Sequence, residues 1–510
     1  MAALLATCST AIRLPFQADV LVNFDAVNFA LGLDGFDLRH HQPHPPGYLG
    51  YILLVRPVYW LLDDANRALT LVSAVAAGVA VGLLYLLARR FAGVASSAVV
   101  AVLFGLSPLA WYYGIVGLSY MPGAAAALAV AWASHSARFD GSRWHLYLAA
   151  ILLALLGALR QTDMILLAPL VIYAGLRFSR CVQLRAAALL AGLTAAWLVP
   201  LLWLSGGPVE YVAESRDLAV LAGGRTSVFG LDPGGLARNV LLVMAGLVLG
   251  TFAALVPLVL TYRRGLLARD ERRFLLLWTV PPLAVFLLVH TGQVGYLLMV
   301  VPAAYLVLAR GLDDRRDADP AEAARPRRPR LSVLAVGVLV VVDVIGFAVL
   351  PGAAVDVARR DAFVAMDVPS NDDHWQAIIH RARQVDPETT AVLTTVRRSG
   401  SFRHLTHYLP DHLVYAMGEG VDGGFGHLFT SHHHESDYSV DGLDDPAEVL
   451  VLPEQVREVL VIDQEPGGFD TDLPSTWELL PDGSAVLTIR VPAGAELRLE
   501  EGPPVRVSPA

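Results

Sequence analysis

Long apolar runs recur along residues 66–350 and are separated by short polar segments. Most runs have roughly 16 to 23 residues, which at 1.5 Å per residue is the length that a helix needs to cross about 30 Å of hydrocarbon. The pattern predicts membrane helices at 67–88, 94–111, 117–134, 145–159, 163–176, 186–204, 238–261, 274–289, 294–310 and 331–350. A purely cytosolic enzyme, a secreted module and a disordered chain are therefore excluded.

Arginine clusters lie between these spans in a regular order, at Arg89–Arg90, Arg138 and Arg143, Arg177–Arg185, Arg263–Arg273 and Arg310–Arg330. If the spans alternate, every cluster falls on the same side, which the positive-inside rule identifies as the cytoplasm. The segments left outside are 17–65, 112–116, 160–162, 205–237, 290–293 and the tail from 351. The sequence thus predicts a multi-pass protein of the plasma membrane with a cytoplasmic N-terminus.

Two apolar segments near the N-terminus need separate treatment. Residues 1–16 are expected to form a first span, although they cover only about 24 Å as a helix and include Arg13, so the total becomes about 11 spans. Residues 48–62 are apolar but short and contain Arg56 followed by proline. If this segment crossed the membrane, every later arginine cluster would lie on the outer side. We therefore expect a helix on the outer surface of the membrane.

The C-terminal tail has the pattern of a soluble domain. It alternates a helix pattern at 374–385 with strand patterns at 390–396, 412–417, 448–452, 458–463 and 484–490. The fold class expected is a polytopic α-helical membrane protein with a soluble α/β domain on the outer face. We place the membrane domain at 1–350, including the first outer loop at 17–65 and a cytosolic linker at 312–330, and the extracytoplasmic domain at 351–510.

Composition supports this division. The chain is 55% hydrophobic and only 17% charged, whereas soluble domains carry about 25% charged residues. Residues 1–350 have 27 arginines against 20 acids, and residues 351–510 have 11 against 27, which accounts for the net charge of −9. The chain contains no lysine, so every fixed cation is a guanidinium, a group suited to phosphate and carboxylate. Its two cysteines suggest no disulfide framework.

The first outer loop carries the densest candidate chemistry. A helix there would present Asp25, Asn28 and Phe29 on one face. The segment 41–46 (HQPHPP) is predicted to be a stiff, non-helical arm, because proline fixes its own φ and favours extended geometry in the residue before it. Such an arm can hold an imidazole at a fixed distance from a carboxylate. The alternative is that Asp25 caps a helix and that the histidines are solvated.

With these features in place, the sequence resembles a known family. It is similar to the polyprenyl-phosphate-sugar-dependent glycosyltransferases of the GT-C superfamily, in the branch of protein O-mannosyltransferases and the aminoarabinose and lipopolysaccharide-core sugar transferases. The resemblance covers about residues 15–350. It rests on Asp25, on the segment HPPGY at 44–48 with its surface helix, and on the segments LLYLLARRFAG (83–93), YYGIVGLSYMPGAAA (112–126), ALRQTDMILLAPL (158–170) and HTGQVGYLLMVVPA (290–303).

The resemblance implies an inverting sugar transfer on the outer face. The donor would be a sugar on a polyprenyl phosphate, and Asp25 would be the base that activates an acceptor hydroxyl. A positioned carboxylate in that role accelerates transfer by roughly 10²- to 10⁴-fold. The acceptor would be a lipid, a polysaccharide or a protein. The tail, with its excess of acids, is a candidate for acceptor selection.

The leaving group, a lipid phosphate, needs cations or hydrogen-bond donors at the membrane surface. The candidates for binding donor phosphate or sugar are Arg39, His41, His44, Arg56, Arg160, Gln161, His290, Gln293 and Tyr296. His44 stands where close relatives often have a basic residue, and an imidazole is mostly neutral near pH 7, so Arg39 or Arg56 could supply the fixed charge instead. Arg160 could equally pair with Asp163, and the group at 290–296 could be ordinary interfacial residues.

Neither a metal nor a nucleotide cofactor is indicated. The run His432–Glu435 matches no zinc spacing, and no nucleotide-phosphate loop is present in the sequence. A divalent metal remains possible without support, and no nucleic-acid partner is expected. Two alternatives to a glycosyltransferase stay open: a lipid or oligosaccharide transporter or flippase, and a glycan ligase of similar architecture. A transporter favours paired repeats and charges near mid-membrane, whereas the polar groups here gather at the outer boundary.

Overall fold

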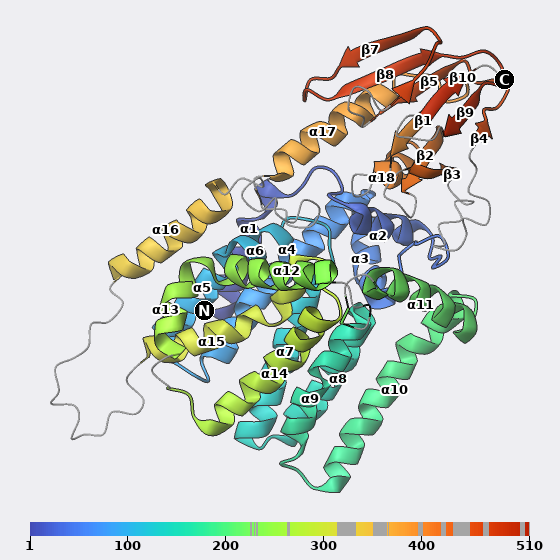
Figure 1. The fold of residues 1–510 in the computed structure, drawn as a ribbon. Coiled ribbons are helices and arrows are strands. Elements are labelled where there is room, and N and C mark those ends of the chain that lie inside the picture. Colours follow the sequence, from blue (N-terminus) through green and yellow to red (C-terminus); the bar gives the residue numbers. More distant parts are fainter. Residues whose placement is uncertain are drawn as a thin grey trace, which may run out of the picture. The chain divides into compact units, whose positions relative to one another are not determined.

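The computed structural model divides the chain into two compact units (Figure 1). We call the first the helical unit, formed by Met1–Gln17, Tyr48–Val209 and Leu218–Asp367, and the second the mixed unit, formed by Ala18–Gly47, Glu210–Asp217 and Val368–Ala510. The structure describes residues 1–224, 227–228, 230, 233–262, 266–313, 333–349, 365, 367–395, 401–419, 425–431, 449–462, 469–499 and 505–508.

The helical unit follows the predicted apolar runs closely. Its elements are α1 (Ala2–Ala11), η1 (Leu14–Phe16), α3 (Leu49–Leu62), α4 (Ala65–Ala88), α5 (Val94–Leu106), α6 (Pro108–Tyr113), α7 (Tyr120–Asp140), α8 (Arg143–Leu159), α9 (Gln161–Gly175), α10 (Arg180–Leu204), α12 (Pro233–Thr251), η2 (Phe252–Ala254), α13 (Leu255–Tyr262), α14 (Arg269–Leu288), η3 (Val294–Met299), α15 (Val301–Leu312) and α16 (Val333–Val349). Helix α11 (Pro208–Gly224) has residues in both units.

Within the part of the chain that the structure describes, three helical stretches are long and apolar enough to cross a membrane: Ala65–Ala88, Arg180–Leu204 and Pro233–Leu260. Other apolar helices are shorter, such as Leu49–Leu62. Some predicted spans are interrupted, because Ser107 and Pro108 end α5 and begin α6. The number of about 11 spans and the sidedness of the loops therefore stay predictions.

The predicted first span is a helix, and its arginine is accommodated by backbone carbonyls. Helix α1 packs closely on α4, where a Cβ at Gly78 would lie 2.2 Å from the Thr10 hydroxyl oxygen. Arg13 is fully buried and donates to the Ser9 carbonyl at 2.7 Å, and also to the carbonyl oxygen of Gly105 near the break between α5 and α6. Carbonyls at helix ends lack intrahelical partners, and these two accept hydrogen bonds from Nη1 and Nη2 of the buried guanidinium.

The mixed unit contains two sheets. Its elements are α2 (Phe24–Asp34), α17 (Asp367–Ala382), α18 (Ser401–Tyr408), β1 (Thr390–Thr395), β2 (Leu413–Glu419), β3 (Phe425–Ser431), β4 (Val449–Val451), β5 (Glu458–Val461), β6 (Phe469–Asp470), β7 (Ser475–Leu479), β8 (Ala485–Arg490), β9 (Glu496–Leu499) and β10 (Val505–Ser508). One sheet has the order β3-β2-β1-β5-β8-β7 and the other the order β4-β9-β10-β6. Strand β1 runs parallel to β2 and β5. The predicted C-terminal α/β domain is confirmed as a fold.

The mixed unit also takes in most of the first outer loop. Val20 belongs to the same buried apolar cluster as Trp375, Ile378 and Ile379 of α17, and α2 packs against α18. The sequence placed this loop with the membrane helices, whereas the structure groups residues 18–47 with the C-terminal domain. The reason is burial: these apolar loop residues have partners in the sheet domain rather than solvent.

Candidate active site

Helix α2 carries Asp25 in its first turn. The helix begins after Asn23, whose side-chain oxygen accepts a hydrogen bond from the backbone N–H of Ala26 at 3.0 Å. Asparagine is a preferred N-cap, because its side chain satisfies one of the backbone donors left open at a helix start. A carboxylate in the first turn of a helix is also favoured by the helix dipole. The sequence thus fixes the position of Asp25 locally.

Asp25 and Phe29 face the same imidazole. One carboxylate oxygen of Asp25 lies 3.8 Å from His44 Nε2, and the rings of Phe29 and His44 are 5.2 Å apart between centroids. The Asp25 side chain is 31% exposed and that of His44 is 10% exposed. The expected helical face and the expected imidazole beside a carboxylate are both present. At 3.8 Å the two atoms are farther apart than in a hydrogen bond, and part of the Asp25 side chain is exposed.

The arm at 41–46 is closely packed on α2. A Cβ added at Gly32 would lie 2.9 Å from the Cδ atom of Pro43, so this glycine permits the close approach. The arm starts from a pair of backbone hydrogen bonds between Asp37 and Gln42, both 2.7 Å long. His41 adopts a left-handed backbone conformation, with φ of 54°, that the surroundings must hold in place. The arm is thereby a defined, non-helical structure, as the sequence predicts.

His41 is the most buried histidine of this arm, with 4% of its surface exposed. Burial, reinforced by the positive charge of Arg403, lowers the pKa of His41 to about 3. Its imidazole is therefore neutral near pH 7, and it can act on a phosphate only through hydrogen bonds. The neighbouring His40 bonds through Nδ1 to the Asp37 carboxylate at 2.6 Å. The Arg39 side chain, by contrast, is exposed.

In the helical unit, Arg160 lies between α8 and α9 and is 6% exposed. It donates through Nε to Asp163 at 3.1 Å and through Nη1 to the Ser119 hydroxyl at 2.8 Å. The ion pair with Asp163, which the sequence left as an alternative, is thus formed. Gly123 leaves room for it, because a Cβ there would lie 2.8 Å from Arg160 Cδ.

Three tyrosine rings surround the same guanidinium. Arg160 Cζ lies 4.5 Å from the ring centroid of Tyr120, 5.1 Å from that of Tyr296 and 5.8 Å from that of Tyr48. Such distances allow cation–π attraction, which is stronger where water is excluded. We call Arg160 and these three residues the arginine–tyrosine cluster. Tyr296 was a predicted site residue, whereas Tyr48 and Tyr120 were not, because ring contacts across distant segments leave no periodic pattern.

His290 and Gln293 lie close to this cluster. The ring centroids of His290 and Tyr296 are 6.4 Å apart, and the Gln293 side-chain oxygen accepts from the Tyr113 hydroxyl at 3.4 Å. Burial, together with the charge of Arg238, lowers the pKa of His290 to about 4. Arg238 donates to the Thr291 carbonyl at 2.9 Å, a contact that the sequence analysis missed. The structure therefore brings the 290–296 group and Arg160 into one region of the helical unit.

Arg56 and Gln161 are the two remaining candidates for binding donor phosphate or sugar. Arg56 is half-buried on α3, and Gln161 is the first residue of α9, directly after Arg160. Among the described residues no group of three or more histidines, cysteines and acids is arranged to hold a metal. The run at 432–435 lies outside the described residues.

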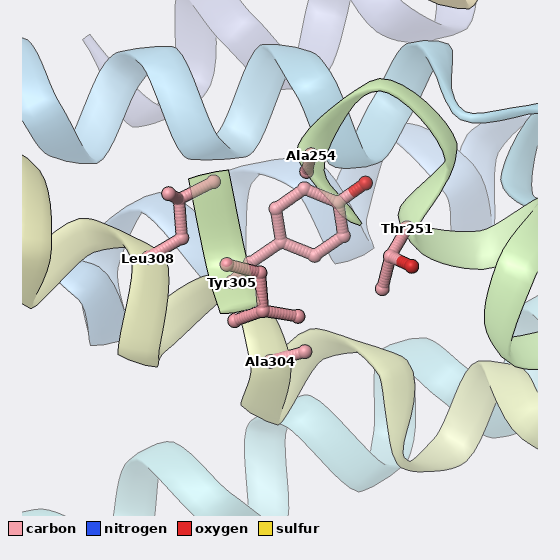
Figure 2. Close-up of a pocket in the computed structure, with 6 residues that line it drawn as sticks. Thr251, Ala254, Ala304, Tyr305 and Leu308 are labelled. Atoms are coloured by element: carbon pink, nitrogen blue, oxygen red, sulfur yellow. The ribbon is translucent and has the colours of Figure 1, made fainter. Parts of the chain in front are cut away.

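A small pocket elsewhere in the helical unit contains none of the predicted site residues. Figure 2 shows it between the 250–258 region and α15, lined by Thr251, Ala254, Leu258, Ala304, Tyr305 and Leu308. The Tyr305 hydroxyl donates to the Gly250 carbonyl at 2.9 Å. These lining residues include no cation that could bind a phosphate, so we do not assign donor binding to this pocket.

Comparison with known proteins finds similarity in structure alone. No family model and no curated protein matches the chain. The structure is similar to that of ArnT from Cupriavidus metallidurans bound to undecaprenyl phosphate, with a TM-score of 0.56 at 14% sequence identity over 96% of this chain and 97% of that chain. The chain shares the fold of that transferase. The apo form of the same protein matches with a TM-score of 0.53 at 14% identity, covering 96% of each chain.

A weaker similarity is to the oligosaccharyltransferase AglB from Archaeoglobus fulgidus, with a TM-score of 0.44 at 13% identity over 90% of this chain and 69% of that chain. The resemblance to the GT-C superfamily, inferred from sequence segments, is confirmed at the level of fold by the ArnT structures. The likeness to ArnT extends over 96% of this chain.

Proposed function

We propose that this chain is a membrane glycosyltransferase that moves a sugar from a polyprenyl phosphate to an acceptor hydroxyl with inversion. The observation that carries the proposal is the placement of Asp25 on a capped helix, partly exposed, beside His44. The fold likeness to ArnT, an aminoarabinose transferase solved with undecaprenyl phosphate, extends over 96% of the chain and supports the same general reaction.

In the proposed reaction Asp25 removes the proton of the acceptor hydroxyl, and the hydroxyl oxygen attacks the anomeric carbon of the donor sugar. The bond from that carbon to the phosphate oxygen breaks on the opposite face, and its electrons leave with the polyprenyl phosphate. One glycosidic bond forms while one glycosyl–phosphate bond breaks, and the configuration inverts. The carboxylate needs an open side for the acceptor, which its 31% exposure provides. General-base catalysis of this kind contributes roughly 10²- to 10⁴-fold.

For the departing phosphate we propose Arg160 as the principal cation. Its guanidinium is already desolvated among tyrosine rings, and Nε and Nη1 are directed to Asp163 and Ser119. A phosphate would add a second anion to this site, and the guanidinium offers five N–H donors in a rigid fork. Gln161, His290, Gln293 and Tyr296 would add hydrogen bonds to phosphate or sugar. Arg39, Arg56 and the His41–His44 arm remain candidates for additional donor contacts.

We also propose that the reaction occurs at the extracytoplasmic face of the plasma membrane, with the N-terminus in the cytoplasm. This sidedness rests on the arginine clusters between the apolar runs. The acceptor would be a lipid, a polysaccharide or a protein. A ligase of similar architecture would transfer a whole glycan by the same displacement and would need an oligosaccharide donor.

The test compares Asp25→Asn with Asp34→Asn, a matched change at the exposed end of the same helix. The purified chain is reconstituted with the lipid-linked sugar that accumulates in cells lacking the protein, and the release of polyprenyl phosphate is measured. We expect Asp25→Asn to lose at least about 100-fold in rate and Asp34→Asn to stay near wild type. Full transfer by folded Asp25→Asn protein would refute the proposal. Donor movement across vesicles without bond cleavage would favour a flippase.

A further inference from the structure

The segment just before α2 is held by side chains from the C-terminal part of the chain. The backbone N–H groups of Asp19 and Val20 donate to the carboxylate of Asp372 at 2.9 and 3.1 Å. The N–H of Leu21 donates to the Tyr408 hydroxyl at 3.0 Å. All these groups belong to the mixed unit. Three consecutive backbone donors of the loop are therefore bound by side chains more than 300 residues away in sequence.

The carbonyl of Leu21 completes this attachment. His404 Nε2 lies 2.5 Å from it and must carry the proton, because a carbonyl oxygen only accepts. The His404 ring stacks on Trp375, with centroids 4.1 Å apart and planes 3° from parallel. His404 is fully buried, so its orientation is fixed by packing as well as by the hydrogen bond. Both polar groups of the Leu21 backbone thus have C-terminal partners.

His404 and Tyr408 both belong to the short helix α18, which also contacts the part of the loop after α2. Arg403 is fully buried and donates through Nη2 to the His40 carbonyl at 2.6 Å. Its guanidinium lies 5.7 Å from the ring of Phe24, and that ring is 5.9 Å from Phe402. Phe24 is the first residue of α2 and directly precedes Asp25. Helix α18 therefore contacts the loop before Asp25, next to Asp25 and after α2.

We propose that the C-terminal domain positions the catalytic loop, with Asp372, His404, Tyr408 and Arg403 as positioning residues for Asp25. The proposal rests on the proposed function for the role of Asp25, but the attachment itself is a property of the mixed unit. Asp25 lies in the first turn of α2, four residues beyond Leu21, so a shift of the attached segment moves its carboxylate. Displacement of a catalytic group by about 1 Å can reduce a rate by roughly 10²-fold.

This role differs from acceptor selection, which the sequence suggested for the tail. A domain that only selects the acceptor would need no bonds to the backbone on either side of α2. The contacts instead satisfy buried backbone groups of the loop, which would otherwise lack partners at a substantial cost. Removal of the domain would consequently disturb Asp25 with every acceptor.

The experiment uses the full chain with the double substitution His404→Phe and Tyr408→Phe. Phenylalanine at 404 keeps the ring that stacks on Trp375, and the change at 408 removes only a hydroxyl. The matched control is Tyr415→Phe, which removes a hydroxyl from a buried tyrosine of β2 in the same unit. Three measurements are made: steady-state kinetics for kcat and the donor KM, amide hydrogen exchange of residues 18–34, and thermal melting.

We expect the double variant to lose roughly 10- to 100-fold in kcat, with a donor KM within about threefold of wild type and faster exchange in residues 18–34. The control should leave all three measurements near wild type. Exchange that stays unchanged in the double variant, or faster exchange with kcat within about twofold, would overturn the positioning role. If wild type transfers no sugar, the proposed function fails, while the exchange measurement still tests the attachment.

Discussion

The imidazole of His44 and the carboxylate of Asp25 face each other at 3.8 Å, one on the proline-rich arm and the other on α2. Phe29, one helical turn beyond Asp25, places its ring 5.2 Å from the same imidazole. The carboxylate is thus flanked on one side by a ring whose own position is fixed by packing. This arrangement limits the directions in which the Asp25 side chain can turn, and 31% of that side chain is exposed.

Replacement of His44 by glutamine should reduce catalysis without unfolding the chain. Glutamine is polar but lacks the ring that packs on Phe29, so the Asp25 carboxylate gains freedom. We expect kcat to fall roughly tenfold, with a smaller change in donor KM. The measurement is steady-state transfer by purified protein. His40→Gln serves as the control, since His40 bonds to Asp37 rather than to Asp25. Equal losses in both variants would contradict a specific role for His44.

Gly32→Ala should move the arm. The new Cβ would lie 2.9 Å from both the Cδ and the N atom of Pro43, which is closer than real contacts allow. Overpacking of this kind typically costs about 1–3 kcal/mol, and here it also displaces His44 relative to Asp25. We expect a lower melting temperature and a several-fold loss in kcat. Gly35→Ala is the matched control, because a Cβ at Gly35 has no heavy atom within 4 Å. Similar melting temperatures for both variants would show that the arm yields without strain.

Much of this architecture follows from local patterns. The apolar strand pattern at 458–463 corresponds to β5 (Glu458–Val461), and the pattern at 484–490 to β8 (Ala485–Arg490), because short runs rich in apolar and β-branched residues form buried strands. Helix α2 follows from its asparagine cap. Strand β7 (Ser475–Leu479) escaped prediction since all five of its residues are exposed, so no apolar alternation marks it.

The candidate site was only partly predictable, because local patterns do not reveal contacts between segments that are distant in sequence. The site residues close to one another in sequence could be predicted. Helix geometry places Asp25 and Phe29 on one face, and the stiffness of the proline-rich arm allows it to hold His44 near a carboxylate. The bonds from Asp372 and His404 to residues 19–21 join positions more than 350 residues apart. A sequence pattern records which face of an element is apolar, but it does not record which distant element covers that face. The sequence pattern therefore does not indicate that the loop packs with the C-terminal domain.

A pair of substitutions can separate the structural and the functional roles of Arg160. The side chains of Arg160 and Asp163 are each 7% exposed, so Arg160→Gln leaves a buried carboxylate without its guanidinium. Loss of one partner from such a pair typically costs about 3–5 kcal/mol, whereas removal of both charges is far milder. We expect Arg160→Gln with Asp163→Asn to melt near wild type but to bind polyprenyl phosphate more weakly by at least about tenfold. Undiminished binding would leave Arg160 as a purely structural residue.

His41 should make stability depend on pH in a defined sense. Its pKa is about 3 in the folded chain against 6.5 for the free side chain, so the unfolded chain binds a proton that the folded chain does not. The stability associated with this group is complete above pH 6.5 and is lost as the pH falls toward 3, at up to roughly 1.4 kcal/mol per pH unit. Asp372 acts in the opposite sense. Burial raises its pKa from 3.8 to about 6, so its contribution is present below pH 3.8 and is lost as the pH rises through 6.

The comparison of wild type with His41→Asn isolates the first effect, because Asp372 is common to both proteins. Asparagine tolerates the left-handed backbone at position 41, so the variant tests the imidazole rather than the conformation. We expect the melting temperature of wild type to fall more steeply between pH 7 and pH 5 than that of the variant, with a difference in unfolding free energy of about 2 kcal/mol accumulated over that interval. An equal change of melting temperature with pH in both proteins would mean that His41 has the same pKa in the folded and the unfolded chain, which would contradict the effect of its burial.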